Sequence, residues 1–151
     1  MEPDAGIGVT TLTRPPRPTK GPFAEQGDRC LRCYRPATIL EWCKQHAEKV
    51  ADERIARYVK RRDGVCVFCG DTRGPYDAAH IFRRRLYYRL RWNPLNLLTA
   101  CRSCHSAFDL DKPTGRRWLR ETRPGLLEQL EALKDSAPRP DIGAIIGMYS
   151  A

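Results

Sequence analysis

The chain has 151 residues, enough for one domain with a small satellite, and its basic residues exceed its acidic residues by nine. That surplus favours a polyanionic partner, nucleic acid before membrane, although a merely soluble basic protein would also carry it. No apolar run reaches the ~18 residues of a membrane-spanning helix. The first ten residues lack the basic start and apolar stretch of a signal peptide. We therefore expect a cytoplasmic protein, in which clustered cysteines bind metal more often than they form disulfides.

Residues 1–28 contain five prolines and almost no periodic apolar residues. Such a segment cannot bury enough surface to order itself, so we expect a flexible basic arm. The arm could contact phosphates or be a passive tail, and its central basic residues are Arg14, Arg17 and Lys20.

Residues 29–62 are expected to form a zinc knuckle and a connecting helix. The pattern C-x-x-C…C-x-x-H supplies the four ligands that a structural zinc ion takes, and these are Cys30, Cys33, Cys43 and His46. The alternative is a group of buried free cysteines beside a surface histidine. Residues 47–62 carry apolar side chains at helical spacing, and Asp63-Gly64 is a helix stop. A knuckle of this kind can be structural or can contact nucleic acid.

Two further C-x-x-C pairs lie within residues 63–112. Their spacing can place four thiolates around a second structural zinc ion, and the ligands are Cys66, Cys69, Cys101 and Cys104. A core this small usually needs such a metal. The chain has seven cysteines and three histidines, so two four-ligand sites leave only His80 and His105 for other chemistry. A disulfide framework would leave one cysteine unpaired.

Between the two cysteine pairs we expect strands at residues 65–69 and 76–82, forming a hairpin, then a loop at 93–100 and a helix from 101 to about 110. On that helix His105 and Asp109 are four residues apart and share a face. A run of five arginines without an acid predicts contact with nucleic-acid phosphates, and comprises Arg83, Arg84, Arg85, Arg89 and Arg91. The same run could be a short amphipathic helix with Leu86, Tyr87 and Leu90 packed inward.

Residues 113–136 are expected to form C-terminal helices. Leucines at helical spacing after Pro124-Gly125 predict a helix that packs onto the core, with a partner helix or a dimer contact as the alternative. Residues 137–151 are expected to be a tail, whose apolar stretch at 142–149 could dock in a groove.

The central histidine, followed by N-L-x-x-x-C-x-x-C-H from Asn96 to His105, resembles the HNH endonuclease family, the ββα-metal nucleases. Cys66 and Cys69 fit its zinc-bearing members. The run from Asp77 to His80, with the arginines after it, more weakly resembles phage recombination nucleases of the NinG type. The resemblance implies a ββα-metal core at 63–112. Together with the N-terminal zinc knuckle and the flanking helices predicted above, we expect a small, zinc-stapled α+β domain. It also implies a metal-dependent endonuclease that hydrolyses phosphodiester bonds in DNA, from a bacterium or a phage-infected host.

By the same resemblance, His80 is the general base, Asn96 steadies it from the facing loop, and His105 binds a catalytic Mg²⁺ or Mn²⁺ distinct from the two zinc ions. The family usually has an Asp or His immediately before the catalytic histidine, where this chain has Ala79. Either Asp77 or Asp109 could replace that ligand, because Mg²⁺ prefers oxygen. The alternative function is a non-catalytic two-zinc protein that binds nucleic acid or supports assembly through a degenerate HNH fold. RNA or branched DNA could also be the substrate.

Overall fold

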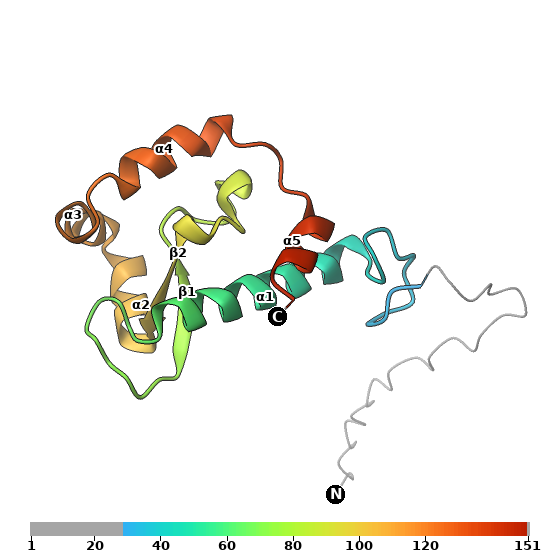
Figure 1. The fold of residues 1–151 in the computed structure, drawn as a ribbon, viewed down its shortest axis with the longest axis horizontal. Helices are drawn as coiled ribbons and strands as arrows, with labels where there is room; N and C mark the ends of the chain where they lie inside the picture. The colour runs from blue at the N-terminus through green and yellow to red at the C-terminus, as the bar shows by residue number, and fades with distance from the viewer. Residues whose placement is uncertain (1–28, 151) are drawn as a thin grey trace, which may run out of the picture.

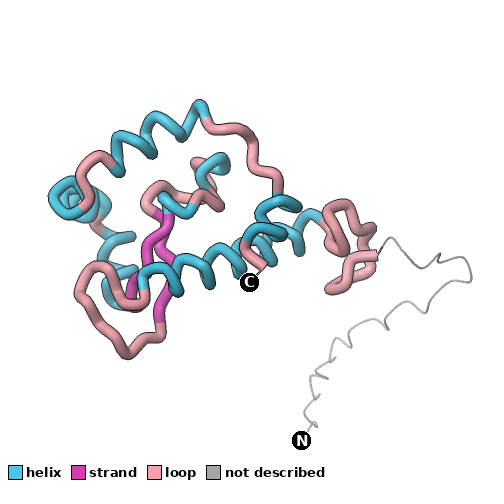
Figure 2. The backbone as a smooth tube through the Cα atoms, in the orientation of Figure 1, coloured by secondary structure: helices cyan, strands magenta, loops and turns pink. Residues whose placement is uncertain are grey.

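Two short antiparallel strands lie at the centre of a mostly helical chain (Figures 1 and 2). The computed structural model describes residues 29–150, so the expected arm at 1–28 lies outside the described residues. In chain order the elements are α1 (Lys44–Asp63), β1 (Tyr76–His80), the 3₁₀ turns η1 (Tyr88–Leu90) and η2 (Pro94–Asn96), β2 (Leu97–Cys101), α2 (Arg102–Leu110), α3 (Lys112–Thr122), α4 (Leu126–Ser136) and α5 (Ile142–Met148). The fold is a small α+β domain, as the sequence predicts.

The central hairpin differs from the prediction in its partner strand. β1 pairs with β2, in a register that places Tyr76 opposite Cys101 and His80 opposite Leu97. Residues 65–69 were expected to be a strand but form a turn, closed by a hydrogen bond from Gly70 N to Cys66 O (2.8 Å). The turn brings the two sulfurs of C-x-x-C to one point, which an extended strand would prevent.

The predicted loop at 93–100 is also wrong in its second half. After the short turn η2, residues 97–100 are fully buried and belong to β2. A run of buried residues without polar alternation is typical of a strand covered on both faces, and its length alone does not distinguish it from a buried loop. Helix α2 follows directly, and the β1–β2–α2 unit is the expected ββα arrangement built from a different second strand.

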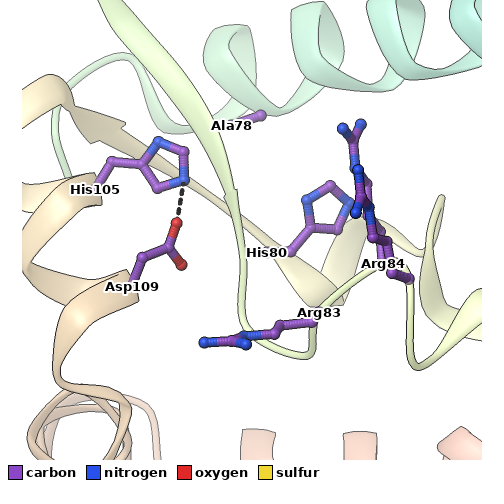
Figure 3. Close-up of a pocket in the computed structure, with 7 residues that line it drawn as sticks. Ala78, His80, Arg83, Arg84, His105 and Asp109 are labelled. Carbon is purple, nitrogen blue, oxygen red and sulfur yellow. Dashed lines mark ion pairs between the residues drawn. The ribbon is translucent and has the colours of Figure 1, made fainter.

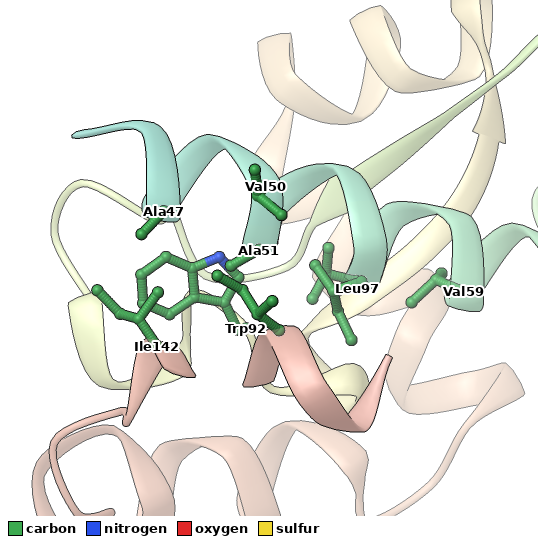
Figure 4. Packing of buried hydrophobic residues seen from close by; sticks show 9 residues of the cluster. Ala47, Val50, Ala51, Val59, Trp92, Leu97 and Ile142 are labelled. Atoms are coloured by element: carbon green, nitrogen blue, oxygen red, sulfur yellow. The ribbon is translucent and has the colours of Figure 1, made fainter. Parts of the chain in front are cut away.

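Helix α1 covers one side of this unit with the apolar face that its sequence periodicity predicts. Its buried residues pack against Trp92, Leu97 and Ile142 (Figure 4). The apolar stretch at 142–149 forms helix α5 and its C-cap residue, Tyr149. Helix α5 packs against α1, where Arg54 donates a hydrogen bond to the carbonyl oxygen of Ile146. At the other end of α1, Asp63 accepts a hydrogen bond from Thr99 N (2.9 Å), which fixes the helix to β2.

A second apolar cluster joins α2, α3 and α4 to the arginine-rich loop. Its members come from all four segments and include Phe82, Leu90, Phe108, Leu119 and Leu130. Helix α4 therefore packs on the core, as its leucine stripe predicts. In the arginine-rich loop Leu90 is buried and Tyr87 packs edge-on to Phe82, whereas Leu86 is exposed, so the expected inward face forms only in part. No helix within residues 29–150 is long and apolar enough to cross a membrane.

Gly115 allows α2 and α3 to approach closely. A Cβ atom at this position would lie 2.3 Å from Cδ2 of Phe108, a buried ring that also packs against Phe68. Such an atom would force the ring to shift, and the ring is held between Phe68 on one contact and the Lys112 ammonium on another.

We expect Gly115→Ala to destabilise the protein by about 1–3 kcal/mol, the usual result of overpacking a core. Gly147→Ala is the matched control, because a Cβ atom there meets nothing within 4 Å. In α5 that change should be neutral or stabilising by up to about 1 kcal/mol, from helix propensity alone. Urea unfolding followed by circular dichroism measures both changes, and equal effects would contradict the packing argument.

Candidate functional site

The first cysteine cluster has the geometry of a tetrahedral zinc site. One ligand atom from each of Cys66, Cys69, Cys101 and Cys104 lies within 4.8 Å of the others, and the sulfurs of Cys69 and Cys101 are 3.9 Å apart. Two sulfurs bound to one tetrahedral zinc ion at about 2.3 Å are roughly 3.8 Å apart. The 66–70 turn supplies one pair of ligands, and the junction of β2 with α2 supplies the other.

The protonation of Cys101 also suits a metal ligand. The Ser103 hydroxyl lies 3.3 Å from its sulfur, and together with the Cys104 backbone amide it lowers the pKa of Cys101 to about 6. This thiol is therefore ionised at neutral pH, in the form that zinc binds.

The N-terminal cluster could also hold a metal ion. Its four ligand atoms come from Cys30, Cys33, Cys43 and His46, and all lie within 4.8 Å of one another. The sulfurs of Cys33 and Cys43 are 3.6 Å apart, and Nδ1 of His46 lies 3.2 Å from the sulfur of Cys30. Cys43 is the N-cap residue of α1 and His46 lies in its first turn, so this cluster also fixes the start of the helix.

The two remaining histidines line one cavity of about 470 Å³, together with Ala78, Arg83, Arg84, Arg85 and Asp109. His80 ends β1, and His105 lies on α2 one residue after Cys104. Figure 3 shows His105 and Asp109 on α2 to one side of β1, and His80 with Arg84 to the other side. A second cavity of about 350 Å³, along α1, shares Ala78, His80, Arg84 and His105 with the first. The histidines therefore lie where two cavities meet.

The hydrogen bond of His80 determines its tautomer. Its Nε2 lies 3.0 Å from the carbonyl oxygen of Arg91, which can only accept, so Nε2 carries the proton and Nδ1 keeps its lone pair. Burial lowers the pKa of His80 below its usual 6.5, and the hydrogen bond to Arg91 opposes this only in part. His80 is therefore neutral at physiological pH, with one nitrogen available to accept a proton.

Arg91 is held in place from α1. Its guanidinium donates to Glu48 (2.9 Å) and, through two nitrogens, to Asp52 (3.1 and 2.7 Å). Asp52 also accepts from the indole of Trp92 at 2.8 Å. The segment that presents the carbonyl oxygen to His80 is thus fixed by two half-buried carboxylates, whose surroundings make these charged hydrogen bonds strong.

Asn96 is fully buried and acts on the loop that begins after His80. Its side-chain oxygen accepts from Phe82 N (2.8 Å), and its amide nitrogen donates to the carbonyl oxygens of Phe82 (3.1 Å) and Leu90 (3.0 Å). Its side-chain hydrogen bonds all go to the backbone of the loop rather than to the imidazole. Asn96 thus holds the backbone of the loop at the second residue after His80. Its predicted role of steadying His80 from the facing loop stays a prediction.

His105 lies between both candidate carboxylates. Its Nδ1 is 3.1 Å from Oδ2 of Asp77, and its Nε2 is 3.3 Å from Oδ2 of Asp109. Each carboxylate also has a cationic neighbour, Arg102 at 3.1 Å from Asp77 and Lys112 at 2.7 Å from Asp109. Burial alone would raise the pKa of Asp109, but the Lys112 ammonium outweighs it and holds that pKa below its usual value. Asp109 could therefore face a cation in ionised form.

The five predicted arginines do not act as one group. Arg91 is bound to Glu48 and Asp52, Arg84 pairs with Asp52 (3.1 Å), and Arg89 donates to the carbonyl oxygen of Ala137. Arg83 and Arg85 are exposed, line the cavity and have no ion-pair partner among residues 29–150. At least two of the five are thus open to an incoming phosphate.

Residues 66–111 match a family model described as HNH endonuclease. This segment has the HNH endonuclease pattern. It contains the Cys₄ cluster, both histidines and Asn96, so the predicted resemblance is confirmed over the part of the chain that carries the cavity. Comparisons with curated proteins and with solved structures found no match.

Several residues that build the site were missed in the sequence. Glu48 and Asp52 lie outside the HNH segment, on a helix whose charged face looks merely solvated, and only the fold brings them to Arg91. Lys112 lies three residues after Asp109 and also donates to the carbonyl oxygen of His80 (3.3 Å). The i,i+3 spacing of Lys112 and Asp109 could have indicated that ion pair.

We expect about two zinc ions per chain by elemental analysis of the purified protein. Cys33→Ser and Cys69→Ser should each lower the content to about one, because each removes a ligand from a different cluster. Cys69→Ser should also unfold the HNH segment, as loss of a structural zinc ion removes folding free energy. One zinc ion per chain in the unmodified protein would contradict the N-terminal site.

Proposed function

We propose that the protein is a metal-dependent endonuclease that hydrolyses phosphodiester bonds in DNA. The observation that supports this most directly is the shared cavity. It brings together a neutral histidine whose Nδ1 keeps its lone pair, a second histidine paired with a carboxylate, and two arginines that have no ion-pair partner within residues 29–150. Phosphodiester hydrolysis needs a base for water and positive groups around the phosphate, and this cavity offers both.

His80 is the general base in this proposal. Its Nδ1 accepts a proton from a water molecule, whose oxygen then attacks phosphorus while the bond to the leaving oxygen breaks. The positive charge that develops on the ring is shared with the Arg91 carbonyl oxygen through Nε2–H. Arg83 and Lys112 lie near enough to Asp109 to stabilise its negative charge, and they supply positive potential beside Asp109.

The residues that would hold a catalytic Mg²⁺ or Mn²⁺ are His105 and Asp109. When bound, such a cation supplies positive charge at the phosphate and at the leaving oxygen. Asp77 and Asp109 face different nitrogens of one imidazole, so only one of them can share a cation with His105. Asp109 lines the first cavity, which also holds Arg83 and Arg85, whereas Asp77 lines the second, along α1. The exposed arginines that could bind a phosphate therefore share a cavity with Asp109, which favours Asp109.

Asp77 then takes the other role. A histidine that binds metal through one nitrogen usually donates the N–H of the other nitrogen to a carboxylate, which orients the ring. Asp77 accepts from Nδ1 in this arrangement, and Arg102 balances its charge. The absence of a ligand at Ala79 is thus compensated from α2, by a carboxylate one helical turn after His105.

Nicking of a supercoiled plasmid tests the function. We expect cleavage only when Mg²⁺ or Mn²⁺ is added, and its loss in His80→Ala with DNA affinity retained. The cleavage rate should rise with pH as His80 loses its proton, with a midpoint below 6.5, because burial lowers its pKa.

The control for this assay omits the added cation instead of using EDTA, which would compete for the structural zinc ions. Equal cleavage by His80→Ala and the unmodified protein would remove His80 from the mechanism. Tight DNA binding without cleavage under any added cation would instead support the non-catalytic two-zinc alternative.

Paired aspartate variants test the cation site independently of cleavage. Asp109→Asn should abolish measurable Mn²⁺ binding by isothermal titration, whereas Asp77→Asn should weaken it about 10–100-fold, the usual effect of removing a partner that orients a ligand. The reverse order of effects would show that Asp77 is the ligand and that Asp109 orients the ring.

A further inference from the structure

The charges around the cavity do not by themselves account for binding of a nucleic-acid strand. Arg91, Arg84 and Arg89 are used in contacts within the chain, which leaves Arg83 and Arg85 open at the site. Affinity for DNA depends chiefly on the number of phosphates that cations neutralise. A protein that holds a strand during cleavage therefore needs further cations next to this cavity.

Helix α3 carries such cations on one face. Lys112, Arg116 and Arg120 follow one another at intervals of four residues, so they form a line along the helix that spans about 12 Å. Lys112 stands at the site itself, where it donates to Asp109 and to the carbonyl oxygen of His80. The line therefore begins at the cavity and leads away from it.

The inner two cations are fixed by aromatic rings of the core. The Lys112 ammonium lies 4.0 Å from the ring centre of Phe108, and the Arg116 guanidinium lies 5.0 Å from that of Phe82. Arg83 and Arg116 both lie near enough to Lys112 to repel its charge. A group of mutually repelling cations held in place by packing is stabilised when an anion binds.

Arg116 and Arg120 are free to bind such an anion. Neither has an ion-pair partner among residues 29–150, and Nε of Arg116 is buried without a hydrogen-bond partner. Both line a third hollow, of about 280 Å³, between α3 and α4, next to Phe82. Arg116 lies one helical turn after Lys112, which contacts His80 and Asp109 of the first cavity, so the cations of α3 connect this hollow to that cavity.

We propose that Lys112, Arg116 and Arg120 bind consecutive phosphates of the DNA strand on one side of the bond that is cut. About 12 Å of duplex axis carries three to four phosphates per strand, which matches three cations. Glu128 and Glu131 form the opposite wall of the hollow, on α4, and Glu131 is paired with Lys134. These carboxylates keep the strand on the α3 wall. The statement that these contacts lie on one side of the cut bond rests on the proposed function. The phosphate contacts themselves do not depend on it.

Salt dependence of DNA binding tests the surface. In a His80→Ala background, which leaves the DNA uncut without a chelator, fluorescence anisotropy gives the affinity for a 20-base-pair duplex at several salt concentrations. The double variant Arg116→Gln/Arg120→Gln should make the negative slope of log K against log salt shallower by about 1.8, at about 0.9 per lost phosphate contact. Arg120→Gln alone should make it shallower by about 0.9, and its exposed side chain makes a folding defect an inadequate explanation.

Arg117→Gln is the matched control. It makes the same change of charge on the same helix, but Arg117 lines neither hollow. An equal slope change in the control and in Arg120→Gln would overturn the proposal, because only net charge would then matter.

Phosphate ethylation should interfere with binding on one side of the cut, and symmetrical interference would overturn the proposed direction. If the unmodified protein binds but never cuts, and Arg120→Gln still makes the slope shallower, the α3 surface stands and the nuclease function fails.

Discussion

The Cys₄ cluster is the constraint on which the rest of the structure depends. The central sheet has only two strands of five residues, too little hydrogen bonding and apolar surface to hold the site by itself. The cluster ties the 66–70 turn to the junction where β2 becomes α2. His105 is adjacent to one of these ligands in the chain, so the geometry of a sulfur-held ion would determine where its imidazole lies. A metal ligand, Cys104, and a histidine of the candidate site, His105, are thus neighbours in the chain.

The other half of the site is supported from outside the HNH segment. His80 is oriented by the carbonyl oxygen of Arg91, and Arg91 is held by Glu48 and Asp52 on α1. Helix α1 begins at Cys43, a member of the N-terminal cluster. Each cysteine cluster is therefore connected to a different histidine, one through the chain and one through a helix and an ion-pair network. This connection gives the knuckle a structural role whether or not it also contacts nucleic acid.

The sequence allowed good prediction where spacing alone determines structure. The ligand sets of both clusters follow from C-x-x-C spacing, and α1 and α4 follow from apolar periodicity. Prediction failed where the decisive partner is distant in sequence. The strand β2 can be recognised only from the segments that bury it. The role of the Asn96 amide depends on the loop carbonyl groups that it contacts. The role of Arg91 depends on two carboxylates about forty residues away in the chain. An arginine-rich run thus looked like one binding surface, although Arg91 is a partly buried cation held by two carboxylates and Arg83 is exposed.

Ala79 illustrates why a departure from a family pattern needs a structural interpretation. Its side chain is 1% exposed and packs with Cys66 and Ala100, on the zinc side of the sheet. A carboxylate at that position would be placed among apolar atoms and thiolates, where an unpaired charge is strongly destabilised. With the backbone in this register, an acidic group at the proposed cation site would come from another position, and β1 and α2 provide Asp77 and Asp109 on the two edges of one imidazole. An alanine before the central histidine is thus compatible with a cation site that has moved to the helix, and it does not by itself indicate a degenerate nuclease.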